Sequence, residues 1–252
     1  MITAVWSGVP DRDELLAGAR SLVARPERLD VMCLAGLVAA RRVLESAGVE
    51  EAAIAERSHA LLVGSAAGCL ETDALYYGQI MDVGLERANP RLFAYTLSNM
   101  VLGEVAIANG FMGDQLAVSC GRASGLAALV EGAALIDTEE VELALVLVID
   151  VLGPATGRLF DALGTVPVPI MAAFLLESRP SAGARGAAAL ATVSGGTAFG
   201  ARRPGSWPDP DPLAGEGVDE VLAALGDGVG ASLRMEARCT SGHTAWLELG
   251  PA

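Results

Sequence analysis

Two unbroken apolar runs restrict the fold of this 252-residue chain more than any other feature. They are residues 59–64 (HALLVG) and 141–149 (VELALVLVI), and apart from Glu142 neither contains a charged residue. Runs of this kind are typical of strands that are buried on both faces of a sheet. Segments with helical spacing flank both runs, so the sequence predicts an α/β fold in which helices cover the sheet.

The neighbouring segments continue the alternation of strands and helices. Asp30 can cap a helix whose leucines and valines recur every three or four residues until Gly48. Helices are expected over residues 13–23, 31–47, 99–108 and 124–136, and strands over residues 2–6, 115–119, 169–176 and 187–193, with a turn at 181–185.

The composition changes after residue 196. Residues 197–217 are rich in proline, glycine and aspartate, which predicts a linker or a long surface loop. A helix is expected at 218–225, followed by a hairpin of strands at 231–237 and 244–249. We therefore expect a main domain over residues 1–196, a linker over 197–217 and a short remnant over 218–252.

The charged residues and the apolar segments exclude several classes of protein. All 17 basic residues are arginine against 31 acidic residues, which gives a net charge of −14. Without lysine, the chain cannot use the lysine of a P-loop, a pyridoxal Schiff base or a protein kinase. An acidic surface repels nucleic acid and anionic membranes. The N-terminus has no signal-peptide pattern, and residues 162–176 are too short to span a bilayer, so we expect a cytoplasmic protein.

Neither a metal site nor a cofactor motif is recognisable. The four cysteines are far apart in the sequence and form no C-x-x-C pair, so reduced thiols are the simplest interpretation. Residues 64–68 (GSAAG) follow a strand as phosphate-binding loops do, but they lack the established motifs, and an ordinary turn is favoured. His59 is interpreted as a structural histidine. We expect no cofactor.

The sequences of four consecutive segments resemble those of a known protein family. NPRLF, TLSNMVLGEVAIANGFMGD, LAVSCGRASGLAALVEGAALI and LALVLVIDV follow one another between residues 89 and 151, and PIMAAFLLESRPSAGARGA comes later. In order and spacing they resemble the N-terminal half of the β-ketoacyl synthases. The resemblance implies a truncated thiolase-like α/β fold, with one full thiolase half and a short remnant of the second.

By this resemblance, Arg122 occupies the position of the family's nucleophilic cysteine. Counting from Gly113 and from Gly125 leads to the same residue. A guanidinium stays protonated and cannot attack a thioester, whereas a cysteine at this helix N-terminus would form the acyl-enzyme. The family's two catalytic histidines are also missing. His243 matches one of the two histidine motifs only in the three residues G-H-T, and it is expected in a hairpin.

A ketosynthase fold without these groups resembles a chain-length factor, and its short length is closest to factors of highly reducing, polyene-forming systems. This implies a non-catalytic subunit that forms a heterodimer with an active ketosynthase, through which it meets the acyl carrier protein. By the same resemblance the segment 96–107 walls the partner's acyl tunnel, and the strand at 115–119 pairs across the dimer. The implied tunnel and interface residues are Thr96, Leu97, Met100, Gly103, Ile107, Leu116 and Val118.

Two questions stay open at this point. Arg122 needs a partner at a buried turn, and the candidate carboxylates are Glu104, Asp150 and Glu131; alternatively it binds an acidic group such as a malonyl carboxylate. The alternative function is a self-standing thiolase-fold acyltransferase or hydrolase that uses Cys120 or Ser124. It is disfavoured because no histidine is placed to activate either residue.

Overall fold

The main sheet has five strands in the order β1-β5-β4-β2-β3. The computed structural model describes residues 1–55, 57–199, 213–239 and 241–252. Strand β2 is parallel to β3 and β4, whereas β5 is antiparallel to β4 and β1. The strands are β1 (Ile2–Ser7), β2 (His59–Gly64), β3 (Asp114–Val118), β4 (Leu143–Asp150) and β5 (Ile170–Glu177). Strands β2, β4 and β5 are buried along their whole length, as their apolar runs predict.

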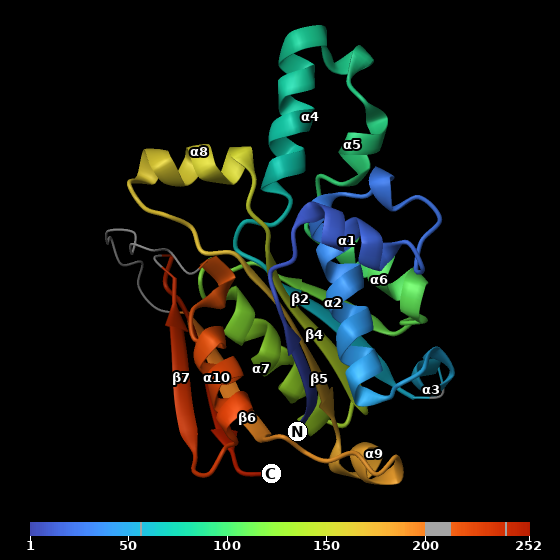
Figure 1. Ribbon diagram of the computed structural model, residues 1–252. Coiled ribbons are helices and arrows are strands. Elements are labelled where there is room, and N and C mark those ends of the chain that lie inside the picture. Colours follow the sequence, from blue (N-terminus) through green and yellow to red (C-terminus); the bar gives the residue numbers. More distant parts are fainter. Residues whose placement is uncertain (56, 200–212, 240) are drawn as a thin grey trace.

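Helices cover both faces of this sheet (Figure 1). On one face lie α1 (Arg12–Ala19), α2 (Val31–Ala47) and α6 (Met100–Asn109). Asp30 caps α2 by accepting a hydrogen bond from the Met32 N–H at 2.7 Å, and Gly48 ends it with φ +64°, as the sequence predicts. On the other face lies α7 (Ser124–Asp137), with α10 (Val218–Asp227) packed against it.

A second sheet lies beyond α7 in the order β6-β8-β7. Its strands are β6 (Thr192–Phe199), β7 (Leu233–Arg238) and β8 (His243–Gly250). Met235, Ala245 and Leu247 face the core, while Arg234 lies over the Trp246 ring on the outer side. Because the outer side carries polar and charged residues, the three strands need no further helix layer to cover them.

The remaining helices lie at the margins of these layers. They are α3 (Glu51–Ala55), α4 (Leu70–Val83), α5 (Pro90–Ala94), α8 (Pro154–Leu163) and α9 (Arg179–Ala184), with 3₁₀ turns η1 (Pro26–Arg28), η2 (Leu85–Arg87) and η3 (Leu213–Gly215). Helices α4 and α5 form an arm that projects from the sheet (Figure 1). None of the described helices has the length and apolar character of a membrane span.

The α/β prediction is confirmed, but the chain between β5 and β6 differs from the prediction. The expected turn at 181–185 is helix α9, because Ser178 caps it by accepting from the Ser181 N–H and Pro180 suits its first turn. The strand expected at 187–193 is wrong over most of its length, since β6 begins only at Thr192. It continues to Phe199, so the first residues of the expected linker are strand; residues 200–212 lie outside the described residues.

His59 has the structural role that the sequence predicts. Its Nε2 accepts hydrogen bonds from the backbone N–H groups of Met112 and Gly113, both at 2.9 Å. Its Nδ1 therefore carries the hydrogen and donates to the Arg57 carbonyl at 2.8 Å. The ring holds the turn into β3 against the start of β2.

Candidate functional site

Arg122 lies in the turn between β3 and α7, where Gly121 adopts φ +62°. The Arg122 side chain is 16% exposed, and its Nε lies 3.8 Å from Glu216 Oε2. The three carboxylates proposed from the sequence are wrong: Glu104 accepts from the Tyr95 hydroxyl, Asp150 binds backbone groups, and Glu131 has no ion pair among the described residues. The actual partner lies near the end of the expected linker, residues 197–217, and nothing in the sequence distinguishes it from the other acids there.

Residues 213–217 lie directly against the start of α7. A Cβ placed on Gly125 would lie 2.2 Å from the Ala214 carbonyl oxygen, and one on Gly217 would lie 2.6 Å from Leu126 Cδ1. Leu213, Ala214 and Gly215 are buried. The chain's own backbone therefore covers the first turn of α7 on this side, next to the Arg122 ion pair.

Asp150 holds this covering segment in place. Its Oδ2 accepts from the Ala214 N–H at 2.8 Å, while its Oδ1 accepts from the Ser65 hydroxyl at 2.7 Å and the Ala67 N–H at 2.8 Å. The Ala66 N–H lies 3.1 Å from both oxygens. Burial raises the pKa of Asp150 and these hydrogen bonds oppose the rise. The backbone N–H groups of the GSAAG segment thus bind an internal carboxylate. This confirms the prediction that the segment is an ordinary turn.

Neither alternative nucleophile is prepared for attack. Ser124 is buried, and its hydroxyl donates to the Gly121 carbonyl at 2.5 Å and accepts from the Cys120 N–H at 3.0 Å. Burial raises the pKa of the Cys120 thiol, which lowers its thiolate fraction. Within the described ranges no hydrogen bond joins either residue to a histidine, since His59 binds backbone and His243 Nδ1 lies 3.0 Å from Ser241 Oγ. His243 begins β8, in the predicted hairpin.

The segment 96–107 presents one open face. Helix α6 buries Val101, Leu102 and Val105, whereas Leu97 is 61% exposed and Ile107 is 82% exposed. A Cβ on Gly103 would meet no atom within 4 Å, and Thr96 and Met100 are half-buried. Leu97, Gly103 and Ile107 are therefore not core residues of this chain.

Strand β3 is an edge of the main sheet and pairs only with β2 among the described strands. Leu116 and Val118 line a cavity of about 460 Å³ between β3, α7 and the second sheet. None of the five predicted residues of the segment 96–107 lines this cavity. The structure thus separates the predicted site residues into two groups, one on the α6 side and one on the α7 side of β3.

The projecting arm adds residues that the sequence analysis missed. Leu75, Tyr77 and Met81 on α4 and Phe93 on α5 are 61–68% exposed. Leu75 and Tyr77 are two residues apart and so do not share one face of the helix, which gives no sequence sign of an apolar patch. Only the structure shows that, in the part of the chain it describes, these side chains are largely exposed. Apolar side chains so exposed are typical of protein–protein contacts.

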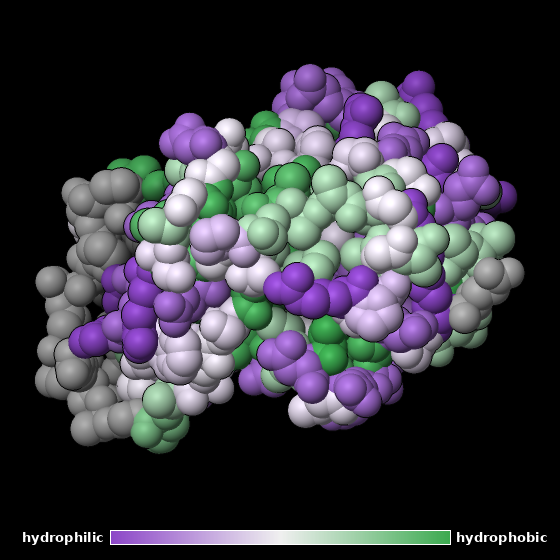
Figure 2. All heavy atoms as spheres, turned by 90° about the horizontal axis from the view of Figure 1, so that it is seen from below, coloured by the Kyte–Doolittle hydropathy of each residue, from purple (hydrophilic) through white to green (hydrophobic). Residues whose placement is uncertain are grey.

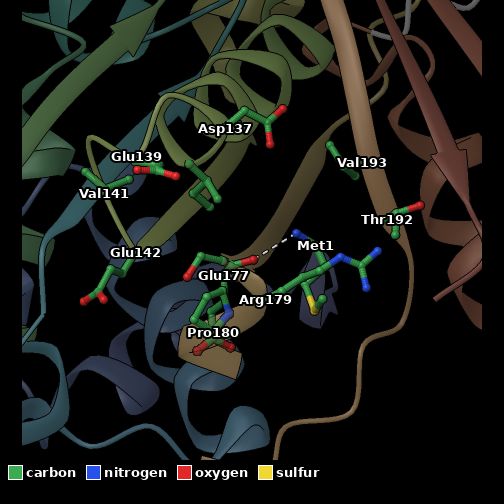
Figure 3. Close-up of a pocket in the computed structure, with 12 residues that line it drawn as sticks. Met1, Asp137, Glu139, Val141, Glu142, Glu177, Arg179, Pro180, Thr192 and Val193 are labelled. Carbon is green, nitrogen blue, oxygen red and sulfur yellow. Dashed lines mark hydrogen bonds between the residues drawn. The ribbon is translucent and has the colours of Figure 1, made fainter. Parts of the chain in front are cut away.

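The opposite end of the molecule holds another cavity, of about 670 Å³, but none of the predicted site residues. Seen from below in Figure 2, this end mixes hydrophilic and apolar residues. Asp137, Glu139 and Glu142 line the cavity together with Arg179, and the Met1 amine donates to the Glu177 carbonyl at 2.9 Å (Figure 3). The cavity adjoins the C-terminal end of α7, so it is separate from Arg122. Over the described ranges no group of three potential metal ligands occurs.

Comparisons with known proteins agree with this fold. Residues 5–169 match the family model described as Beta-ketoacyl synthase, N-terminal domain. The solved structure described as the ishigamide ketosynthase/chain length factor superposes with a TM-score of 0.82 at 15% identity, covering 100% of this chain and 98% of that chain. A β-ketoacyl synthase from Burkholderia phymatum STM815 gives 0.80 at 13% identity, covering 100% and 98%.

A third structure also covers the whole chain. It is described as AntDE:AntF, a type II PKS acyl-carrier protein in complex with its ketosynthase, and it gives a TM-score of 0.82 at 15% identity, covering 100% of this chain and 99% of that chain. No curated protein matches the sequence. At these identities the likeness shows the fold, and the ketosynthase-type fold class predicted from the sequence is confirmed.

Proposed function

Because the chain belongs to the β-ketoacyl synthase family, we propose that it is a chain-length factor: a non-catalytic subunit that pairs with an active ketosynthase of a type II polyketide synthase and shapes its acyl tunnel. Arg122 carries this proposal, since it stands where the family has its nucleophilic cysteine and forms an ion pair with Glu216. A guanidinium cannot form an acyl-enzyme. The chemistry must then come from another chain.

The exposed surface fits a subunit that needs a partner. No described element of this chain covers the edge of β3, the open face of the segment 96–107 or the apolar arm. An obligate heterodimer of this kind buries more than about 2,000 Å². The partner is the catalytic ketosynthase, and the acyl carrier protein meets the complex mainly through that partner, in the cytoplasm.

The narrower assignment is to highly reducing, polyene-forming systems. It rests on the resemblance of this chain to such factors in length. The alternative of a self-standing acyltransferase gains no support, since the Ser124 hydroxyl is engaged in the turn and burial raises the pKa of the Cys120 thiol.

Acylation of the purified complex tests the proposal. We expect the chain to co-purify with the ketosynthase encoded beside it, and intact-protein mass spectrometry after incubation with acyl thioesters to show the acyl mass on the ketosynthase alone. Stable acylation of the isolated chain at Cys120 or Ser124 would instead identify an enzyme. A monomer that binds no ketosynthase from its own gene cluster would also contradict the proposal.

Restoring a thiol should not restore catalysis. We expect Arg122→Cys to leave condensation without the partner at the background rate, because the family's histidines are absent and residues 213–217 cover the start of α7. Arg158→Cys, on the exposed surface of α8, is the matched control for adding a thiol. Malonyl-dependent chain extension by the R122C variant alone would show that another residue polarises the thioester in place of the family's histidines.

A further inference from the structure

The residues that line the cavity beside β3 indicate what kind of side chain can occupy it. Besides Leu116 and Val118, it is lined mainly by small side chains of α7 and the second sheet, among them Ala123, Ala127 and Ala198. Its volume of about 460 Å³ exceeds that of any single side chain and opens next to the unpaired edge of β3. Glu131 of α7 is the only carboxylate among its lining residues.

Glu131 differs from the two buried carboxylates among the described residues, Asp150 and Glu177. Asp150 accepts from three backbone N–H groups and a hydroxyl, and Glu177 is held by Arg57 and Arg185. Glu131 is half-buried, yet among the described residues it has neither a hydrogen bond nor an ion pair. Because its carboxylate faces the cavity with no donor among the described residues, Glu131 is placed for a cation from outside this chain.

A second copy of the chain does not provide that cation. Strand β3 reads DQLAV, so its own strand brings Asp114 and no basic residue to the edge. The nearest basic residue along the chain is Arg122, which is already paired with Glu216. Pairing of two β3 edges from identical chains would therefore add acidic groups near Glu131 and leave its charge uncompensated.

Resting on the proposed heterodimer, we propose that Glu131 selects the ketosynthase partner: the cavity receives an arginine or lysine side chain from the partner strand that pairs with β3, and Glu131 binds it. The N–H and C=O groups along the edge of β3 that no described strand pairs with supply affinity for any strand, whereas Glu131 supplies the discrimination. The same carboxylate disfavours the homodimer, in which no such cation is available.

Binding measurements on the complex with the cognate ketosynthase test this role. We expect Glu131→Gln to weaken the heterodimer about tenfold and Glu131→Arg about a hundredfold or more, with the salt dependence of the dissociation constant reduced in both variants. Glu248→Gln is the matched control, because Glu248 is a half-buried glutamate of β8 that does not line the cavity. It should bind within twofold of the unmodified chain.

Charge exchange identifies the cation. Each arginine and lysine of the partner's pairing strand is replaced by glutamate, and one of these changes should restore binding of the E131R variant. Light scattering on the isolated chain should show more homodimer for E131Q than for the unmodified chain. If the unmodified chain binds the ketosynthase but E131Q binds equally well, the role of Glu131 is wrong and the proposed function stands; if the unmodified chain does not bind, the proposed function itself fails.

Discussion

Replacing Asp150 with asparagine is expected to lower the free energy of unfolding by about 3 kcal/mol, one of the largest single effects in this chain. Both carboxylate oxygens accept backbone N–H groups, Oδ1 from Ala67 and Oδ2 from Ala214. An amide NH₂ at either position would face a donor, so one side of the network must break whichever way the side chain turns. The hydrogen bonds lost are those that join the residue-150 side chain either to the turn after β2 or to the segment that covers α7.

Thermal unfolding and hydrogen exchange check this expectation. For a chain of this length, 3 kcal/mol corresponds to a fall in melting temperature of about 6–12 °C. Exchange should quicken in the peptides that contain Ala66, Ala67 and Ala214. Asp161→Asn, on the exposed surface of α8, should change the melting temperature by no more than about 2 °C. An unchanged melting temperature for D150N would mean that the segment 213–217 is held by other contacts.

The parts of the fold that the sequence predicts are those fixed by local chemistry. The runs that form β2 and β4 are apolar enough to require burial on both faces, and α2 has both a capping aspartate and a terminating glycine. Helix α4 was missed because its N-cap residue, Cys69, makes no capping hydrogen bond and its apolar residues face away from the core.

The candidate site shows the same difference between features set by local sequence and features set by long-range packing. The resemblance places Arg122 at the family's nucleophile position by spacing along one continuous segment, so this expectation depends on local sequence alone. Its ion pair joins it to Glu216, near the end of the expected linker. That Glu216 is the partner, and not Glu104, Asp150 or Glu131, depends on how the chain returns to α7. Pairing across such a separation is set by tertiary packing, which a pattern in one sequence does not encode.

The segment 96–107 offers the most direct test of function, because its open face separates a role in a tunnel from a role in the core. Gly103 has free space where a side chain would project, and Leu97 and Ile107 are largely exposed. Substitutions there should leave the fold of this chain intact. Any change they cause must then act on what covers this face in the complex.

We therefore expect Gly103→Leu to shift the products of the complex to chains shorter by at least one two-carbon unit, while the early condensation rate is kept. Met100→Trp should shift them in the same direction, although Met100 also packs partly against the core of this chain. In the proposed heterodimer, the added side chains fill volume at the far end of a tunnel whose thioester end lies on the partner. Met100→Ala and Leu97→Ala should permit longer products for the converse reason. Product profiles by mass spectrometry and melting curves of the same complexes measure both quantities.

Gly157→Leu is the matched control for the bulky change. Gly157 is also a helical glycine with no atom within 4 Å of its Cβ position, but it lies on α8 and outside the segment 96–107. It should leave product length unchanged, which separates the effect of position from the effect of added bulk. If instead Gly103→Leu lowers all products in parallel with heterodimer stability, by the few kcal/mol typical of overpacking, the segment is an ordinary interface and the chain-length role is wrong.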